Sequence, residues 1–234
     1  MDLTALKQVL KEISNGNNLG EEIFLVGATK TVSANDINCA TSAGLKIVAE
    51  NKVQEFREKS SLIENATQHF IGHLQTNKVK YLVGKVEVIQ SVDSIHLGQA
   101  ISNEAVKKQV VQEILVQVNV GCELSKSGFS LEQTENAVKE LSQLPNLKIV
   151  GLMAMLPNSE DYSLLKNLCL QMRETFDKLK SNGYPFKYLS MGMTHDYKIA
   201  IANGSNMIRL GSAVFGKRNY EVTNWYGLEH FWQR

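Results

Sequence analysis

Short apolar runs alternate with longer segments of helical period along almost the whole chain. Runs rich in Val and Ile predict eight strands, at 23–29, 45–50, 68–71, 86–90, 113–119, 147–153, 187–191 and 207–210. Apolar residues at helical spacing predict helices near 33–43, 52–64, 76–83, 95–107, 130–143, 160–182 and 195–203, after a first helix at about 3–15.

Most of these strands are apolar at nearly every position rather than at alternate positions, as residues 113–119 illustrate. Such runs are typical of parallel strands that are buried on both faces. Eight of them in strict alternation with helices predict an α/β protein built as a single closed (β/α)8 TIM barrel. A doubly wound open sheet is the alternative fold.

Composition narrows the class of protein. The 234 residues carry 25 basic and 24 acidic side chains, so bulk charge favours neither a nucleic-acid nor a membrane-surface partner. Cys39, Cys122 and Cys169 form no CxxC pair, which fits a reducing compartment. Without a secretory or membrane-spanning segment, we expect a cytoplasmic protein. We expect one domain over residues 1–234, with residues 221–234 as a C-terminal tail that forms a final helix or cover.

Candidate chemistry lies at the carboxyl ends of the predicted strands, where barrels of this kind collect their functional groups. The first strand ends at Lys30 and the second at Asn51. The seventh runs into Ser190-Met191-Gly192-Met193-Thr194, and the eighth carries Arg209 before Gly211 and Ser212. If the barrel closes, an amine, an arginine and a glycine-rich segment face one mouth.

This combination suits an aldehyde that carries a phosphate. The connections after the seventh and eighth strands, with a helix N-terminus, form the recurrent phosphate cup of such barrels. Gly192 and Gly211 let backbone N–H groups approach an anion, and Ser190, Thr194 and Ser212 add hydroxyl donors. A neutral lysine amine is the nucleophile that forms an imine with an aldehyde.

Each residue also has a plainer interpretation. Lys30 could be a solvated lysine at a strand end, and Arg209 could be a structural ion-pair partner of Glu50 or Asp196. Gly192 and Gly211 could be ordinary turn glycines. His69 and His73 are four residues apart, but their strand-like context does not suit a zinc site, so no metal is predicted.

Taken together, the segments resemble the pyridoxal phosphate homeostasis proteins, single-domain relatives of the alanine racemase N-terminal barrel. The resemblance covers roughly residues 20 to 220. It rests on Ala28-Thr29-Lys30-Thr31, Glu50-Asn51-Lys52-Val53-Gln54-Glu55, residues 69–78 and 91–93, Gln117-Val118-Asn119, residues 125–128, Gly151-Leu152-Met153, residues 189–196 and residues 209–216.

The resemblance implies that Lys30 holds pyridoxal 5′-phosphate as a Schiff base. It places Arg209 against the pyridine nitrogen and Asn51 near the ring of this cofactor. It implies that the phosphate is bound by Ser190, Gly192, Thr194, Gly211 and Ser212.

The expected role is to hold and buffer pyridoxal 5′-phosphate without catalytic turnover. Related two-domain racemases use a second domain to complete their site, and the chain is too short for such a domain after Tyr220. We expect a monomer that hands its cofactor to apo-enzymes in transient contacts, with no nucleic-acid or membrane partner. A pyridoxal-phosphate-dependent amino-acid racemase and a Schiff-base aldolase are the alternatives.

Overall fold

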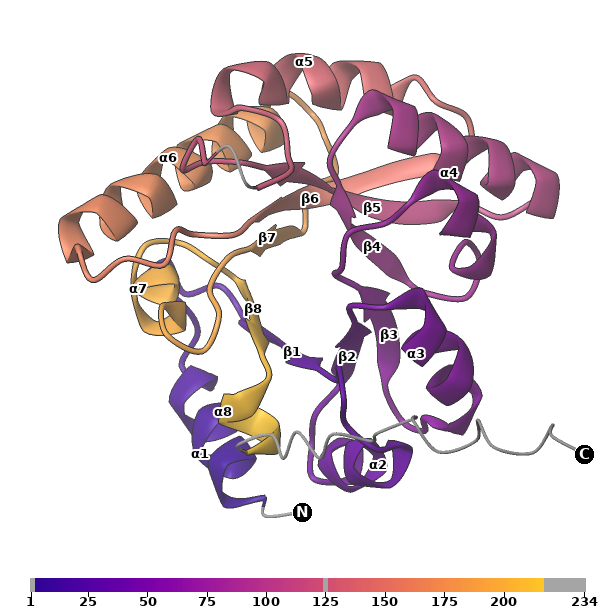
Figure 1. The fold of residues 1–234 in the computed structure, drawn as a ribbon. Helices are drawn as coiled ribbons and strands as arrows, with labels where there is room; N and C mark the ends of the chain where they lie inside the picture. The colour runs from indigo at the N-terminus through magenta and orange to yellow at the C-terminus, as the bar shows by residue number, and fades with distance from the viewer. Residues whose placement is uncertain (1–2, 124–125, 217–234) are drawn as a thin grey trace, which may run out of the picture.

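The chain folds into a closed barrel of eight parallel strands surrounded by helices (Figure 1). The computed structural model describes residues 3–123 and 126–216, so the predicted tail at 221–234 lies outside the described residues. The strands follow one another in chain order, and β8 pairs with β1. They are β1 Phe24–Ala28, β2 Ile47–Glu50, β3 Thr67–Phe70, β4 Val88–Val92, β5 Gln112–Val118, β6 Leu147–Ala154, β7 Tyr188–Ser190 and β8 Met207–Leu210. The predicted barrel is confirmed, and the closing pair of strands shows that the open-sheet alternative is wrong.

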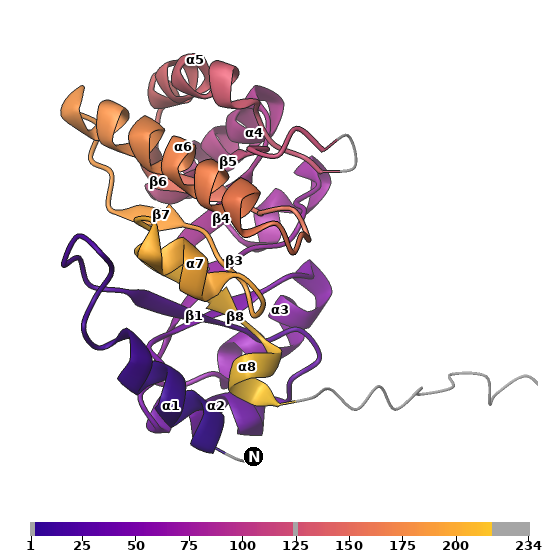
Figure 2. The ribbon, with the colours of Figure 1, turned by 90° about the vertical axis from the view of Figure 1, so that its left-hand side faces the viewer.

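Helices fill most of the connections between the strands. They are α1 Thr4–Ile13, α2 Ala34–Ser42, α3 Val53–Lys59, α4 Ile95–Lys108, α5 Leu131–Ser142, α6 Tyr162–Ser181, α7 Tyr197–Ala202 and α8 Ser212–Phe215, with 3₁₀ helices η1 Ser60–Leu62 and η2 Thr76–Tyr81. Figures 1 and 2 show α1 beside α8, and both pack on the outer face of β1 and β8. These two helices thereby cover β1 where it pairs with β8 and closes the barrel.

Two helices differ from the sequence prediction. The segment expected to be helical at 76–83 is a 3₁₀ helix, in which only Val79 is buried and the following backbone bond runs from the Leu82 N–H to the Val79 carbonyl. Leu82 and Val83 are buried too, but they lie in the turn at 82–85 that follows the 3₁₀ helix. The four-residue helix α8 was not predicted, because it is too short to show a helical period.

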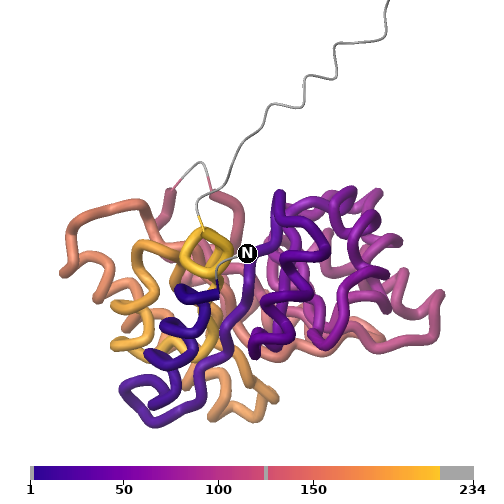
Figure 3. The backbone as a smooth tube through the Cα atoms, turned by 90° about the horizontal axis from the view of Figure 1, so that it is seen from below, coloured from indigo at the N-terminus to yellow at the C-terminus, as the bar shows by residue number. Residues whose placement is uncertain are grey.

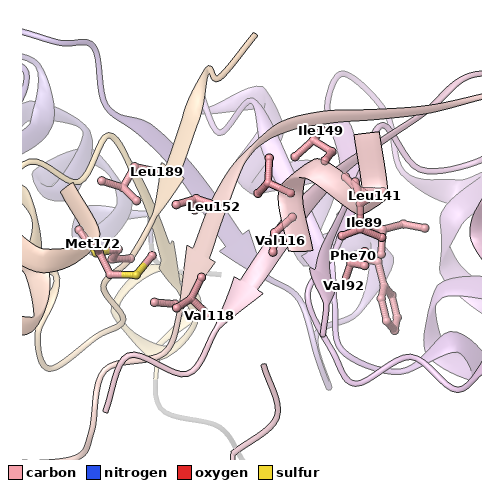
Figure 4. Packing of buried hydrophobic residues seen from close by; sticks show 14 of the residues in the cluster. Phe70, Ile89, Val92, Val116, Val118, Leu141, Ile149, Leu152, Met172 and Leu189 are labelled. Atoms are coloured by element: carbon pink, nitrogen blue, oxygen red, sulfur yellow. The ribbon is translucent and has the colours of Figure 1, made fainter. Parts of the chain in front are cut away.

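Side chains of the strands alternate between the barrel interior and the surrounding helices. The interior cluster consists of Val26, Ile47, Ala49, Val88, Leu115, Val150, Met153, Tyr188 and Met207. Their neighbours along the strands belong to the outer clusters. Figure 4 shows Ile89, Val116 and Leu152 of this outer layer, with Leu141 from α5 and Met172 from α6. Because every second side chain of a strand points inward, this alternation determines which residues can reach the mouth of the barrel.

The two ends of the barrel are clearly separated. Figures 2 and 3 show the connection that follows β5 at one end and the segment that precedes β1 at the other. Because all strands are parallel, their carboxyl ends meet at the first of these ends. Within the described residues, no helix combines the length and apolar composition needed to cross a membrane.

Gly72 allows the ends of β2 and β3 to approach each other closely. A Cβ atom at this position would lie 1.9 Å from the carbonyl oxygen of Asn51, which is far too short for two atoms that are not bonded to each other. The backbone at Asn51, which is one of the predicted site residues, therefore depends on a glycine in the neighbouring strand end.

We expect Gly72→Ala to destabilise the protein by about 1–3 kcal/mol or more, because the added methyl group must displace the Asn51 backbone. The matched control is Gly121→Ala, whose Cβ would make an ordinary contact of 3.5 Å with Pro157 and should change stability by only about 0.5 kcal/mol. Urea unfolding midpoints of the two variants measure this difference. Equal midpoints would show that the β2–β3 approach is not a steric constraint.

Candidate cofactor site at the barrel mouth

The alternation of side chains along the strands brings four of the predicted site residues to the inner face of the barrel. Lys30 stands four residues after the interior Val26, in step with the alternation of β1, and Asn51 stands two residues after the interior Ala49. Ser190 and Arg209 stand two residues after the interior side chains of Tyr188 and Met207. Lys30 and Asn51 lie near the rim and are partly exposed, whereas Ser190 and Arg209 lie deeper and are buried.

Arg209 is a buried cation that is held by neutral oxygens. Its Nη1 donates to the Ser190 carbonyl at 2.9 Å and to Ser190 Oγ at 2.6 Å, and its Nη2 donates to the Ala154 carbonyl at 2.9 Å. Burial lowers the pKa of Arg209 to about 10, and the charge of Asp196 opposes that change. The guanidinium therefore stays protonated at neutral pH.

The predicted alternative of an ion pair between Arg209 and Glu50 is wrong, because Glu50 pairs with Lys59 instead. Asp196 uses its carboxylate to accept the Met193 N–H at 2.5 Å. Within the described residues, Arg209 has no carboxylate within ion-pair distance. A cation of this kind can donate to a ligand without first giving up a carboxylate partner.

Three polar side chains continue inward from Arg209 through the barrel. Ser190 Oγ donates to Gln90 Oε1 at 2.8 Å, and Gln90 Nε2 lies 2.9 Å from His69 Nδ1. Burial and, to a smaller extent, the charge of Lys187 lower the pKa of His69 to about 3. Its ring is therefore neutral, with Nδ1 as acceptor and the proton on Nε2, which has no partner among the described residues.

Sequence reasoning missed this chain of hydrogen bonds. The only signal was that Gln90 stands two residues after Val88, as a polar residue inside an apolar strand run. The Ser190 hydroxyl takes part in this series of hydrogen bonds: it donates to Gln90 and accepts from Arg209. The assignment of Ser190 to phosphate binding stays a prediction, and its contacts in this structure position Arg209.

The segments after β7 and β8 supply backbone donors without partners. Gly192 has φ of +98°, and a Cβ there would lie 2.8 Å from Tyr197 Cα, so this position requires glycine. Within the described residues, the N–H groups of Gly192, Gly211 and Ser212 donate no hydrogen bond. Because α7 and α8 are only 6 and 4 residues long, these donors would attract an anion more than any helix dipole.

The hydroxyls of this region differ in their surroundings. Ser212 is exposed at the start of α8, and Thr194 is partly exposed in the turn before α7. Thr194 also lines a groove that it shares with Tyr162 and His195, outside the barrel interior. The structure therefore brings Gly192, Gly211 and Ser212 to strand ends beside one another and leaves Thr194 further out.

Lys30 and Asn51 complete the rim with groups that have no partner among the described residues. In residues 3–123 and 126–216, the Lys30 side chain forms no hydrogen bond or ion pair. Asn51 Oδ1 is buried and lacks a hydrogen-bond partner in the same residues. Buried polar atoms are nearly always satisfied, so an orphan beside a free amine indicates a place for a ligand. The amine and the backbone donors at the mouth fit an aldehyde that carries a phosphate.

The buried, neutral ring of His69 makes the stability of the fold depend on pH. Its folded pKa of about 3 lies below the unfolded value near 6.5, so the unfolded chain binds more protons between these values. Stability is therefore fully present above pH 6.5 and falls as the pH drops, with a slope of up to about 1.4 kcal/mol per pH unit. We expect His69→Gln to remove this slope between pH 5 and 6.5, as measured by urea unfolding. His96→Gln on the exposed surface is the control, and an unchanged slope in His69→Gln would contradict the buried neutral ring.

The chain is similar to known proteins over most of its length. The family model of the alanine racemase N-terminal domain matches residues 1–219. A pyridoxal phosphate homeostasis protein of Aquifex aeolicus is 38% identical, over 93% of this chain and 96% of that protein. One of Escherichia coli K12 is 32% identical, over 86% of this chain and 88% of that protein.

Solved structures show the same barrel. PipY of Synechococcus elongatus with pyridoxal phosphate bound has a TM-score of 0.80 and 27% identity, over 91% of this chain and 98% of that one. An alanine racemase of Clostridium difficile has a TM-score of 0.71 at 15% identity and shares the fold alone. This chain covers 56% of that racemase.

Proposed function

This chain belongs to the alanine racemase N-terminal domain family, and from that premise we propose that it binds pyridoxal 5′-phosphate for cellular homeostasis of this cofactor. The observation that carries the proposal is the amine of Lys30, which has no partner in residues 3–123 and 126–216, at a mouth whose floor is a protonated arginine. Relatives named for this role match most of the chain, and the PipY structure contains pyridoxal phosphate.

Each residue has a stated part in the proposed binding. Lys30 would hold the aldehyde through its amine, with the aldehyde oxygen lost as water. Arg209 would donate a hydrogen bond to the ring nitrogen, and Asn51 would contact the ring. The backbone donors of Gly192, Gly211 and Ser212, with the hydroxyl of Thr194, face the phosphate. Ser190 belongs to the same site through its contact with Arg209.

We propose that binding is not followed by turnover. When bound, the cofactor supplies an electron sink whose strength depends on protonation of its ring nitrogen. Arg209 keeps its proton at neutral pH and leaves that nitrogen unprotonated, which makes the sink weak. Within the described residues, no acid or base contacts Lys30 that could serve as its catalytic partner. The proposal takes residues 1–234 as one barrel domain that acts as a cytoplasmic monomer.

The first test is the role of Lys30. Lys30→Ala should lose the visible absorbance that wild-type protein gains with pyridoxal 5′-phosphate, because the variant lacks the amine that forms the imine in the proposed binding. Lys46→Met is the control, since Lys46 is exposed at the opposite end of the barrel, and it should retain the band. A persistent band in Lys30→Ala would show that the amine has been misassigned.

The second test separates a carrier from an enzyme. Loaded protein should restore activity to an apo pyridoxal-phosphate enzyme, because the imine at the rim is open to exchange. It should racemise or decarboxylate no amino acid above the background of free cofactor. Turnover at an enzymatic rate of about 1 per second or more that disappears in Lys30→Ala would favour the racemase alternative.

A further inference from the structure

A second lysine lies beneath the backbone turn that carries Lys30. Lys59, in the last turn of α3, is 13% exposed. Its ammonium lies close to four oxygens, which are Glu50 Oε1 at 2.5 Å, Glu55 Oε2 at 3.0 Å, Thr29 O at 3.0 Å and Val32 O at 3.2 Å. Two of these are backbone carbonyls on either side of Lys30, so Lys59 joins both ends of the turn.

The residue after Lys30 has an unusual backbone conformation. Thr31 has φ of +63°, which is uncommon for a residue other than glycine and is an outlier for a β-branched one. Its N–H donates to Glu55 Oε2 at 2.7 Å, the same carboxylate oxygen that contacts Lys59. The contact with α3 thus holds the chain in the conformation that turns it away from β1 after Lys30.

Thr29, the residue before Lys30, is held by the carboxylate of Glu50. Thr29 Oγ1 donates to Glu50 Oε1 at 2.7 Å and lies 3.1 Å from the Ala49 carbonyl. Glu50 is 3% exposed and faces the helix side of β2, since Ala49 before it and Asn51 after it face the interior. Both neighbours of Lys30 are therefore fixed by side chains that lie outside the barrel interior.

The two lysines have opposite surroundings. Lys59 is surrounded by two carboxylates and two carbonyls, whereas Lys30 has no partner in the described parts of the chain. Burial disfavours the charged form of Glu55, but the Thr31 N–H and Lys59 outweigh it and lower the pKa of that carboxyl. The Lys59 amine is thus occupied by oxygens of this group, whereas the Lys30 amine has no such contact among the described residues.

We infer that Lys59, Glu55 and Glu50 form a clamp that positions Lys30 for imine formation while keeping the Lys59 amine out of that reaction. The members of the clamp contact the residues on either side of Lys30 rather than the Lys30 side chain, so they are positioning residues. The inference rests on the proposed function, because it assigns the clamp to the same amine. It predicts that losing the clamp slows the covalent step and leaves non-covalent recognition at the mouth intact.

The experiment compares two ligands on the full chain. Stopped-flow absorbance measures imine formation with pyridoxal 5′-phosphate, and titration measures affinity for pyridoxamine 5′-phosphate, which has no aldehyde. Lys59→Met should slow imine formation by roughly tenfold to a hundredfold. Its affinity for pyridoxamine 5′-phosphate should stay within about twofold of wild type. Lys52→Met is the control. Lys52 is 70% exposed, and its amine lies as far as 4.0 Å from Glu55 Oε1, so this variant should match wild type with both ligands.

A second variant protects the test against misfolding of Lys59→Met. Glu55→Ala removes the acceptor of the Thr31 N–H from a partly exposed position and should slow imine formation in the same direction. Wild-type rates in either folded variant would overturn the clamp, as would equal losses with both ligands. A wild-type chain that forms no imine would overturn the proposed function and the clamp with it.

Discussion

Closure of a parallel barrel is the constraint on which the site depends. It sends alternate strand residues inward and places every strand's carboxyl end at one mouth, so Lys30, Asn51 and Arg209 converge although they are far apart in the chain. The same closure surrounds Arg209 with an apolar interior, where an unpaired cation is costly. Carbonyls of Ser190 and Ala154 and the hydroxyl of Ser190 stabilise it there without using a carboxylate.

The fold and the rim of the site could be predicted because both follow from local patterns. Apolar runs mark the strands, and Lys30, Asn51 and Gly211 directly follow runs of this kind. The 3₁₀ geometry of residues 76–81 could not be predicted, because so short an apolar pattern does not distinguish a 3₁₀ helix from an α-helix. The helix α8 is too short for a helical period to appear. Contacts between distant segments were also missed: the Gln90 bond to Ser190 spans 100 residues, and Lys59 reaches back 30 residues to Thr29.

In the proposed function, this arrangement holds a reactive aldehyde without turning it over. The proposed anchors are an amine at the rim, backbone donors after β7 and β8, and a cation that does not protonate the ring nitrogen. Covalent capture then depends on how the turn at 29–32 presents Lys30, and recognition depends on groups elsewhere at the mouth. Separate sets of residues for the two steps would allow the cofactor to be kept tightly and still be released.

The central claim is that Lys30, among all the lysines of the chain, is the one that forms the imine. The most direct measurement is borohydride reduction of the loaded protein, which makes the bond permanent, followed by mass spectrometry of its peptides. The account predicts one modified residue, Lys30, at close to one cofactor per chain. Modification at Lys59 or at a lysine away from the mouth, with Lys30 unmodified, would contradict it.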